Sequence, residues 1–299
     1  MSIIKALYGG KDEVYRGDYS ITSLIDSPRI FQLTKRHRDE LLPSQFVGDH
    51  YSIFLGHAVH HYLSLFGHDS KDNYISKNEF RMFYNYSDKI IISGCIDYLE
   101  TMNSFTTIYD YKVTSVWSYM IGNGKAKPEW VRQLNLYRYL YLKDSPNNKV
   151  DALCNVLFFR DWSANDAKYK AGYPESPIKS IEVDLWDYDK LEKYLQSRVD
   201  LHEHASTLDD HLLPYCTEEE TWERKPTYAI YRMNKSGKFP DRASKLYDDL
   251  ADAMREAYPN GTKSPTVNME ERKGERVRCE SYCAVKEYCN QYRIWKDGK

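Results

Sequence analysis

Two aspartates and a lysine could do chemistry together, because their spacing would gather three charged groups on one face of a β-hairpin. Asp97 lies in the β-branched, apolar run 89–100. Asp110 and Lys112 lie in a second run of this kind, 104–115. If a short turn joins the two runs as antiparallel strands, Asp97 and Asp110 become approximate cross-strand neighbours. Lys112 follows Asp110 by two residues and therefore projects from the same face.

Two carboxylates and an ammonium group are what metal-assisted hydrolysis of a phosphodiester needs. Carboxylates bind Mg²⁺ or Mn²⁺, which prefer oxygen ligands, and such an ion polarises a phosphate and lowers the pKa of water. The Lys112 ammonium would stabilise developing negative charge and help to orient or deprotonate the water. The backbone carbonyl of Val113, which adjoins Lys112, is a natural further metal ligand. We therefore predict Asp97, Asp110 and Lys112 as the reaction centre.

The same triplet also suits a solvated sheet face, where charge pairs are common. From the triplet alone the two interpretations are equally good. The apolar residues around it, such as Ile96, Ile108 and Val113, favour a functional site. Charges set in otherwise buried strands need a compensating partner.

The elements that must position these groups can be read from the spacing of apolar residues and from Gly and Pro. Helical spacing covers 20–40, where Pro28 must interrupt the helix, and 51–67. We also predict strands over 79–86, 89–100, 104–115 and 151–162, a helix from 125–128 to about 144, a loop over 163–180, irregular structure over 216–240, and helices over 184–212 and 241–258.

Composition sets wide bounds on function. Lys and Arg number 42 against 44 Asp and Glu, a net charge of −2, which argues weakly against a non-specific polyanion binder. A local basic groove is compatible with an acidic remainder. The chain has no run of about 18 apolar residues, and its N-terminus lacks a signal-peptide pattern. We therefore expect no membrane contact and a cytoplasmic location, the host cytoplasm if a phage encodes the chain.

Four short motifs occur in order between residues 52 and 140. They are Gly56-His57-Ala58-Val59-His60, Gly94-Cys95-Ile96-Asp97, Asp110-Tyr111-Lys112 and Gln133-Leu134-Asn135-Leu136-Tyr137. Together they resemble the motifs of the PD-(D/E)XK nuclease superfamily, in its RecB/Cas4-like branch, which includes phage exonucleases. One such motif is weak evidence, whereas four in the same order are fairly specific.

The resemblance implies an α/β fold with a mixed central β-sheet flanked by helices. It implies metal ligation by His60, Asp97 and Asp110, with Lys112 catalytic. It places Gln133 and Tyr137, which share one helix face, near the DNA and the active site. We expect one nuclease domain over 1–299, with a core at about 50–162 and a helical, Cys-rich C-terminal extension at about 184–299.

The expected activity is a divalent-metal-dependent DNA exonuclease that uses Mg²⁺ or Mn²⁺. The resemblance suggests DNA recombination, repair or processing in a phage or bacterium, with DNA and a recombination protein as partners. Two alternatives stay open. One is an endonuclease or end-processing enzyme on the same core. The other is a non-catalytic DNA-binding or complex-forming module, which the intact Asp97, Asp110 and Lys112 argue against.

Several of these side chains also have ordinary explanations. Taken alone, His60 would be a hydrogen-bonded helix histidine, and Gln133 and Tyr137 would be positions on an amphipathic helix. His57 and His61, spaced i, i+4, could instead form a zinc pair, although no third ligand is obvious. Glu79, at the start of a strand, is a candidate supporting acid.

Basic residues surround the helix that carries Gln133. Lys125, Lys127, Arg132 and Arg138 are candidate phosphate contacts, and Arg132 is the one we select. A solvated helix face explains any one of them at least as well.

Three of the six cysteines form the pattern C-x3-C-x5-C at the C-terminal end, namely Cys279, Cys283 and Cys289. In a cytosolic chain such clusters indicate metal ligands rather than disulfides, and a tetrahedral sulfur site needs a fourth ligand. Related nucleases carry an iron–sulfur cluster held by three C-terminal cysteines and one near the N-terminus. Here the N-terminal place is Ser27-Pro28, so we predict Cys216 as the fourth ligand of a [4Fe–4S] cluster or a Zn²⁺ ion. Cys95 and Cys154 lie in apolar strands and are expected in the core.

Overall fold

The computed structural model describes residues 17–41, 51–65, 70–71 and 74–298. The described residues form two compact units, one from the ranges 1–26 and 42–206 and the other from the ranges 27–41 and 207–299. The sequence led us to expect one domain with a C-terminal extension, whereas the structure groups 27–41 with the C-terminal residues. Arg29 contributes to this grouping, because it is fully buried and hydrogen-bonded to Pro214 and Asn290.

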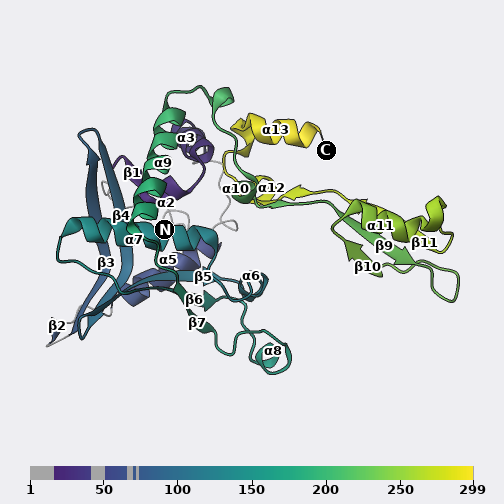
Figure 1. Cartoon of the computed structure of the whole chain (residues 1–299), viewed down its shortest axis with the longest axis horizontal. Coiled ribbons are helices and arrows are strands. Elements are labelled where there is room, and N and C mark those ends of the chain that lie inside the picture. The colour runs from purple at the N-terminus through teal and green to yellow at the C-terminus, as the bar shows by residue number, and fades with distance from the viewer. Residues whose placement is uncertain (1–16, 42–50, 66–69, 72–73, 299) are drawn as a thin grey trace, which may run out of the picture. The chain divides into compact units, whose positions relative to one another are not determined.

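A mixed β-sheet organises the first unit (Figure 1). Its main path runs β2-β3-β4-β5-β6-β7, and β1 pairs with β4, which makes seven strands among the described residues. The pairs β1–β4 and β5–β6 are parallel and the others are antiparallel. The strands are β1 (Tyr19–Ser20), β2 (Ser70–Lys71), β3 (Tyr74–Ser87), β4 (Ile90–Met102), β5 (Phe105–Thr114), β6 (Ala152–Phe159) and β7 (Ile178–Val183). The predicted α/β fold with a mixed sheet flanked by helices is confirmed.

The helices described in this unit are α2 (Ile21–Ile25), α5 (Tyr51–Ser64), α6 (Val116–Ile121), α7 (Pro128–Asp144), α8 (Ala164–Tyr169) and α9 (Tyr188–Ser206). Helix α7 begins at Pro128, whose fixed φ suits a first helical turn. It packs on β3 and β4, where a Cβ added to Gly94 would meet the Tyr137 ring at 3.0 Å. Gly94 therefore lets the helix approach β4 closely and places the α7 side chains beside Asp97.

Several expectations about elements need adjustment. Pro28 does interrupt the first helical segment, which divides into α2, α3 (Pro28–Arg36) and α4 (Arg38–Leu41). The expected loop over 163–180 contains α8 and the first residues of β7, whose edge-strand side chains are mostly exposed and give little apolar signal. Residues 66–67 of the helix expected over 51–67 lie outside the described residues.

The second unit combines short helices with small sheets. A three-stranded sheet of β9 (Thr227–Arg232), β10 (Lys245–Tyr247) and β11 (Val267–Arg272) packs against α11 (Leu250–Ala257) around Ile230, Ala253 and Ala257. The expected irregular stretch 216–240 and helix 241–258 thus contain β9 and β10. The other elements are α10 (Glu218–Thr221), β8 (Glu223–Arg224), β12 (Glu275–Arg276), α12 (Val277–Ser281), α13 (Asn290–Asp297) and the 3-10 turns Asp210–Leu212, Pro259–Gly261 and Lys286–Tyr288. None of the helices described in either unit is both long and apolar enough to cross a membrane.

Candidate active site

A tight turn brings the two aspartates together. Asn103 and Ser104 join β4 to β5 with φ angles of 50° and 66°, so that Met102 pairs with Phe105. Two consecutive residues with positive φ are typical of the two-residue hairpin turn that matches strand twist. The ladder continues to the pair Tyr98–Tyr109. The ladder ends there, and Asp97 and Asp110 are the residues that follow its last pair on the two strands.

Asp110 is almost completely buried, with 1% of its surface exposed. Its Oδ2 lies 2.7 Å from the Lys112 Nζ and accepts a 3.0 Å hydrogen bond from the Asn155 Nδ2. Asn155 is the register partner of Asp110 on the parallel strand β6. Burial raises the pKa of Asp110 above its usual range, although the Lys112 charge opposes the rise. The ion pair with Lys112 therefore favours the carboxylate form that could hold a cation.

Asp97 joins the hairpin to helix α5. Its Oδ2 accepts a 2.7 Å hydrogen bond from the Tyr111 backbone N–H, and its Oδ1 lies 3.3 Å from the His60 Nδ1. Glu79 Oε1 lies 3.7 Å from the same nitrogen. One ligand atom from each of His60, Glu79 and Asp97 lies within 4.8 Å of the other two. The structure thus brings His60 to the aspartates and adds Glu79 to the group.

The charge around His60 favours a cation. Burial lowers the pKa of the imidazole, but hydrogen bonds and charges from Asp97 and Glu79 outweigh burial and raise it to about 10. The His60 Nε2 also lies 3.1 Å from the carbonyl oxygen of Tyr111. The carboxylates of Glu79 and Asp97 lie at the Nδ1 of this imidazole, and Asp110 is close enough to interact electrostatically with Asp97 and His60. Carboxylates with one imidazole form a donor set that fits Mg²⁺ or Mn²⁺.

Gln133 and Tyr137 on α7 are buried and connect to Lys112 through hydrogen bonds. Gln133 Oε1 accepts a 2.9 Å hydrogen bond from Lys112 Nζ, and its Nε2 donates one of 2.8 Å to the Tyr137 hydroxyl. Both side chains are buried, with 8% and 5% of their surfaces exposed. An ion pair with Asp110 and a chain of hydrogen bonds through Gln133 to Tyr137 hold the Lys112 ammonium in one position.

Two groups that contact the site residues were not predicted from the sequence. The sequence could have indicated Asn155, because it is a polar residue inside an apolar run. In the structure it has no exposed surface. The sequence could not indicate the Tyr111 carbonyl, because every residue has a backbone carbonyl. Val113, whose carbonyl is a predicted ligand, pairs with Phe158 in the β5–β6 ladder.

The other candidates lie apart from the hairpin or have other contacts. Arg138 Nη1 donates a 2.7 Å hydrogen bond to the Trp186 carbonyl, and Lys127 lies over the Trp130 ring. Arg132 is half-buried on α7. His57 and His61 are exposed and, within the described ranges, join no group of three potential metal ligands.

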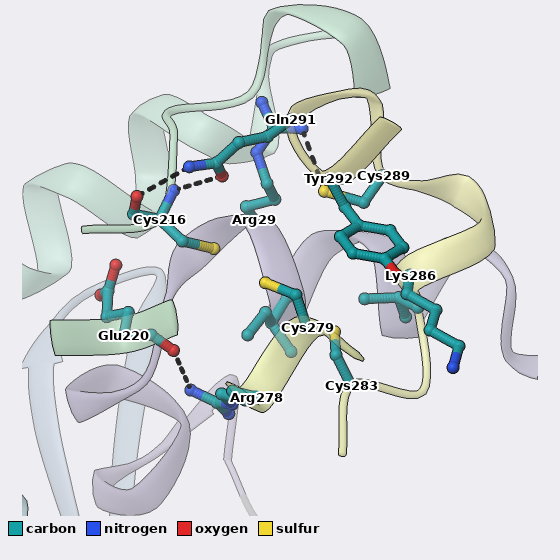
Figure 2. A pocket seen from close by; sticks show the side chains of 12 residues that line it. Arg29, Cys216, Glu220, Arg278, Cys279, Cys283, Lys286, Cys289, Gln291 and Tyr292 are labelled. Atoms are coloured by element: carbon teal, nitrogen blue, oxygen red, sulfur yellow. Dashed lines mark hydrogen bonds between the residues drawn. The ribbon is translucent and has the colours of Figure 1, made fainter. Parts of the chain in front are cut away.

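Four cysteines line one pocket of the second unit. Figure 2 shows Cys216, Cys279, Cys283 and Cys289 around it, with the sulfurs of Cys216 and Cys279 turned toward each other. All four are free thiols. Burial raises the pKa of Cys216 to about 12 and that of Cys279 to about 11. Ser27 occupies the place where related nucleases have their N-terminal cysteine. Its Oγ lies 3.1 Å from the Sγ of Cys216, the residue predicted to replace that cysteine.

The remaining two cysteines lie in the first unit. Cys154 is buried in β6. Cys95 is only half-buried, and its Sγ contacts Glu79 Oε2 at 3.5 Å. Cys95 therefore belongs to the surroundings of the Glu79–His60 pair as well as to the sheet.

Comparison with known proteins assigns most of the chain to one family. A family model described as the PD-(D/E)XK nuclease superfamily matches residues 31–290. The solved structure of SSO0001 is 17% identical, with 66% of this chain and 81% of that one covered and a TM-score of 0.42. An alkaline exonuclease from Laribacter hongkongensis, LHK-Exo, is 10% identical, with 62% and 87% covered and a TM-score of 0.34. Among curated proteins, none matches the sequence.

Proposed function

Because the chain belongs to the PD-(D/E)XK nuclease superfamily, we propose that it is a divalent-metal-dependent DNA exonuclease. The observation that carries the proposal is the group of His60, Glu79 and Asp97, with Asp110 in electrostatic range and a lysine held by two partners. The four motifs, which resemble those of phage exonucleases, favour an exonuclease over an endonuclease. A role in DNA recombination or repair, alongside a recombination protein, would follow from this activity.

The cation ligands proposed here are His60, Asp97, Asp110 and one backbone carbonyl. We keep the Val113 carbonyl in this role, because the Tyr111 oxygen lies 3.1 Å from the His60 Nε2 and would instead hold the imidazole with its Nδ1 toward Asp97. When bound, Mg²⁺ or Mn²⁺ would polarise the phosphate and make water more acidic. Asp97 is held in place for this task by the Tyr111 N–H at 2.7 Å. Glu79 supports His60 from the neighbouring strand.

Lys112 is the proposed catalytic residue. Its ammonium group stabilises negative charge that develops on the phosphate and can orient the attacking water by donating a hydrogen bond to the water oxygen. Asp110 and Gln133 fix the Nζ atom at 2.7 Å and 2.9 Å. We assign Gln133 and Tyr137 a positioning role through Lys112 because both are buried. Arg132 stays a predicted contact with the DNA backbone.

A second proposed metal centre lies in the other unit. Cys216, Cys279, Cys283 and Cys289 would hold it and tie the segment around Cys216 to α12 and α13. The resemblance to nucleases that carry an iron–sulfur cluster favours a [4Fe–4S] cluster over Zn²⁺, and its role would be structural.

The test of the proposed activity compares DNA with and without ends. The purified protein is incubated with a linear duplex and a covalently closed circle, in Mg²⁺, in Mn²⁺ or in EDTA. We expect degradation of the linear DNA only, and none in EDTA. Cleavage of the circle would establish the endonuclease instead. Binding of DNA without cleavage in either metal would support the non-catalytic module.

A further inference from the structure

Arg29 is a fully buried arginine in the pocket of the four cysteines, with no exposed surface. Its Nε donates a 3.1 Å hydrogen bond to the Pro214 carbonyl, and its Nη2 donates to the Leu213 carbonyl. Its Nη1 lies 2.5 Å from the Asn290 Oδ1 and 3.9 Å from the Cys289 Sγ. The guanidinium thus bonds neutral oxygen atoms on two sides and faces a sulfur on the third.

Within the described part of the chain, no carboxylate forms an ion pair with Arg29. Hydrogen bonds to carbonyls satisfy its N–H groups but do not neutralise its charge. A buried charge without a counter-ion destabilises the folded state. The structure therefore needs an anion at this place, and the face of Arg29 toward Cys289 is where it would lie.

The other charged side chains that line the pocket do not supply a negative charge for Arg29. Arg278 and Lys286 are cations, whose side chains donate to the carbonyls of Glu220 and Glu280. Glu220 is the one acidic residue among those lining residues. Its carboxylate accepts a 2.9 Å hydrogen bond from the Thr217 N–H in the capping box of α10. The lining thus carries three cations against one carboxylate.

We propose that Arg29 is the counter-ion of an anionic metal–thiolate centre and donates a hydrogen bond to the Cys289 thiolate. The inference rests on the four-cysteine centre proposed above. Four thiolates around Zn²⁺ or a dipositive iron–sulfur core leave a net negative charge. That charge pairs with Arg29, so Arg29 is a positioning residue for the centre and stabilises its bound state over the metal-free state.

The competing explanation is that Arg29 only ties α3 to the loop at 213–214 and to Asn290. The two explanations differ in what they predict for charge. A structural tie depends on the shape of the guanidinium, so lysine and glutamine would disturb it alike. A counter-ion depends on the positive charge, so Arg29→Lys keeps part of the function and Arg29→Gln loses it.

The experiment compares metal retention in the full-length wild type, Arg29→Lys, Arg29→Gln and the control Lys35→Gln, all purified without oxygen. Lys35 lies exposed on α3, so its replacement makes the same charge change on the same helix. The readouts are zinc and iron content, the rate of metal release to a chelator, and the gain in Tm between metal-free and metal-loaded protein. If iron is present, the reduction potential is measured as well.

We expect Arg29→Gln to release metal about 10- to 100-fold faster than wild type, with a smaller metal-induced gain in Tm and a lower reduction potential. Arg29→Lys should fall between the two, and Lys35→Gln should match wild type. Equal release by wild type and Arg29→Gln, or equal defects in both Arg29 variants, would overturn the counter-ion role alone. A wild type without zinc or iron would overturn the four-cysteine centre and Arg29 with it.

Discussion

Replacing Lys112 with alanine is expected to slow DNA cleavage by roughly 10²- to 10⁴-fold. The variant loses the ammonium that Asp110 and Gln133 hold at 2.7 Å and 2.9 Å, and no other described lysine takes these contacts. The loss should appear in kcat and kcat/KM alike, because the charge acts on the transition state. Single-turnover cleavage of a linear duplex in Mn²⁺ measures it.

The matched control is Lys149→Ala. Lys149 also pairs with an aspartate, Asp151 at 3.3 Å, but its side chain is 59% exposed, so only a small effect on stability is expected. A Tm measurement on both variants separates lost catalysis from lost folding, since Lys112→Ala leaves Asp110 buried without its partner. If folded Lys112→Ala cleaves DNA as fast as Lys149→Ala, Lys112 has no part in the reaction.

Exchanging Cys216 for serine is expected to empty the cysteine centre of metal. It should also destabilise the second unit by several kcal/mol, because metal binding is coupled to folding. The contact of 3.1 Å between Ser27 Oγ and Cys216 Sγ allows a stronger test. The double variant Ser27→Cys/Cys216→Ser moves the thiol across that contact and should restore metal binding. Zinc and iron analysis, the visible absorption spectrum and Tm provide the measurements.

Cys154→Ser serves as the control, because Cys154 is buried in β6 of the other unit. Its metal content per folded molecule should equal that of wild type. Full metal content in Cys216→Ser would remove Cys216 from the centre. A double variant that folds but stays without metal would show that residue 27 cannot supply the fourth ligand.

The hairpin that holds the site was predictable because local rules determine it. The apolar runs and a short turn predicted the two aspartates as approximate neighbours, and the two-residue turn at Asn103 and Ser104 sets the register that ends beside them. The position of Lys112 on the same face as Asp110 follows from the two-residue period of a strand. His60, in contrast, is joined to Asp97 across 37 positions of sequence, and only the resemblance to a nuclease family indicated that contact.

The remaining features depend on tertiary contacts that no local pattern encodes. The Tyr111 carbonyl lies beside His60 because α5 packs on β5. Gln133 turns toward Lys112 because Gly94 lets α7 approach β4 closely. The place of 27–41 in the second unit depends on the burial of Arg29. An amphipathic α3 gave no sign of which unit its apolar face would join.

The central claim is that Asp97 and His60, with Asp110, hold a divalent cation, and Mn²⁺ binding at several pH values tests it most directly. Free Mn²⁺ is followed by electron paramagnetic resonance in wild type and Asp97→Asn between pH 6 and 8. Because the pKa of His60 is raised to about 10, the imidazole is protonated across this range and must lose its proton to become a ligand. Wild type should therefore bind Mn²⁺ about tenfold more tightly per pH unit, and Asp97→Asn should bind it at least about tenfold more weakly at each pH. Wild-type affinity that is unchanged by pH and by Asp97→Asn would contradict the account.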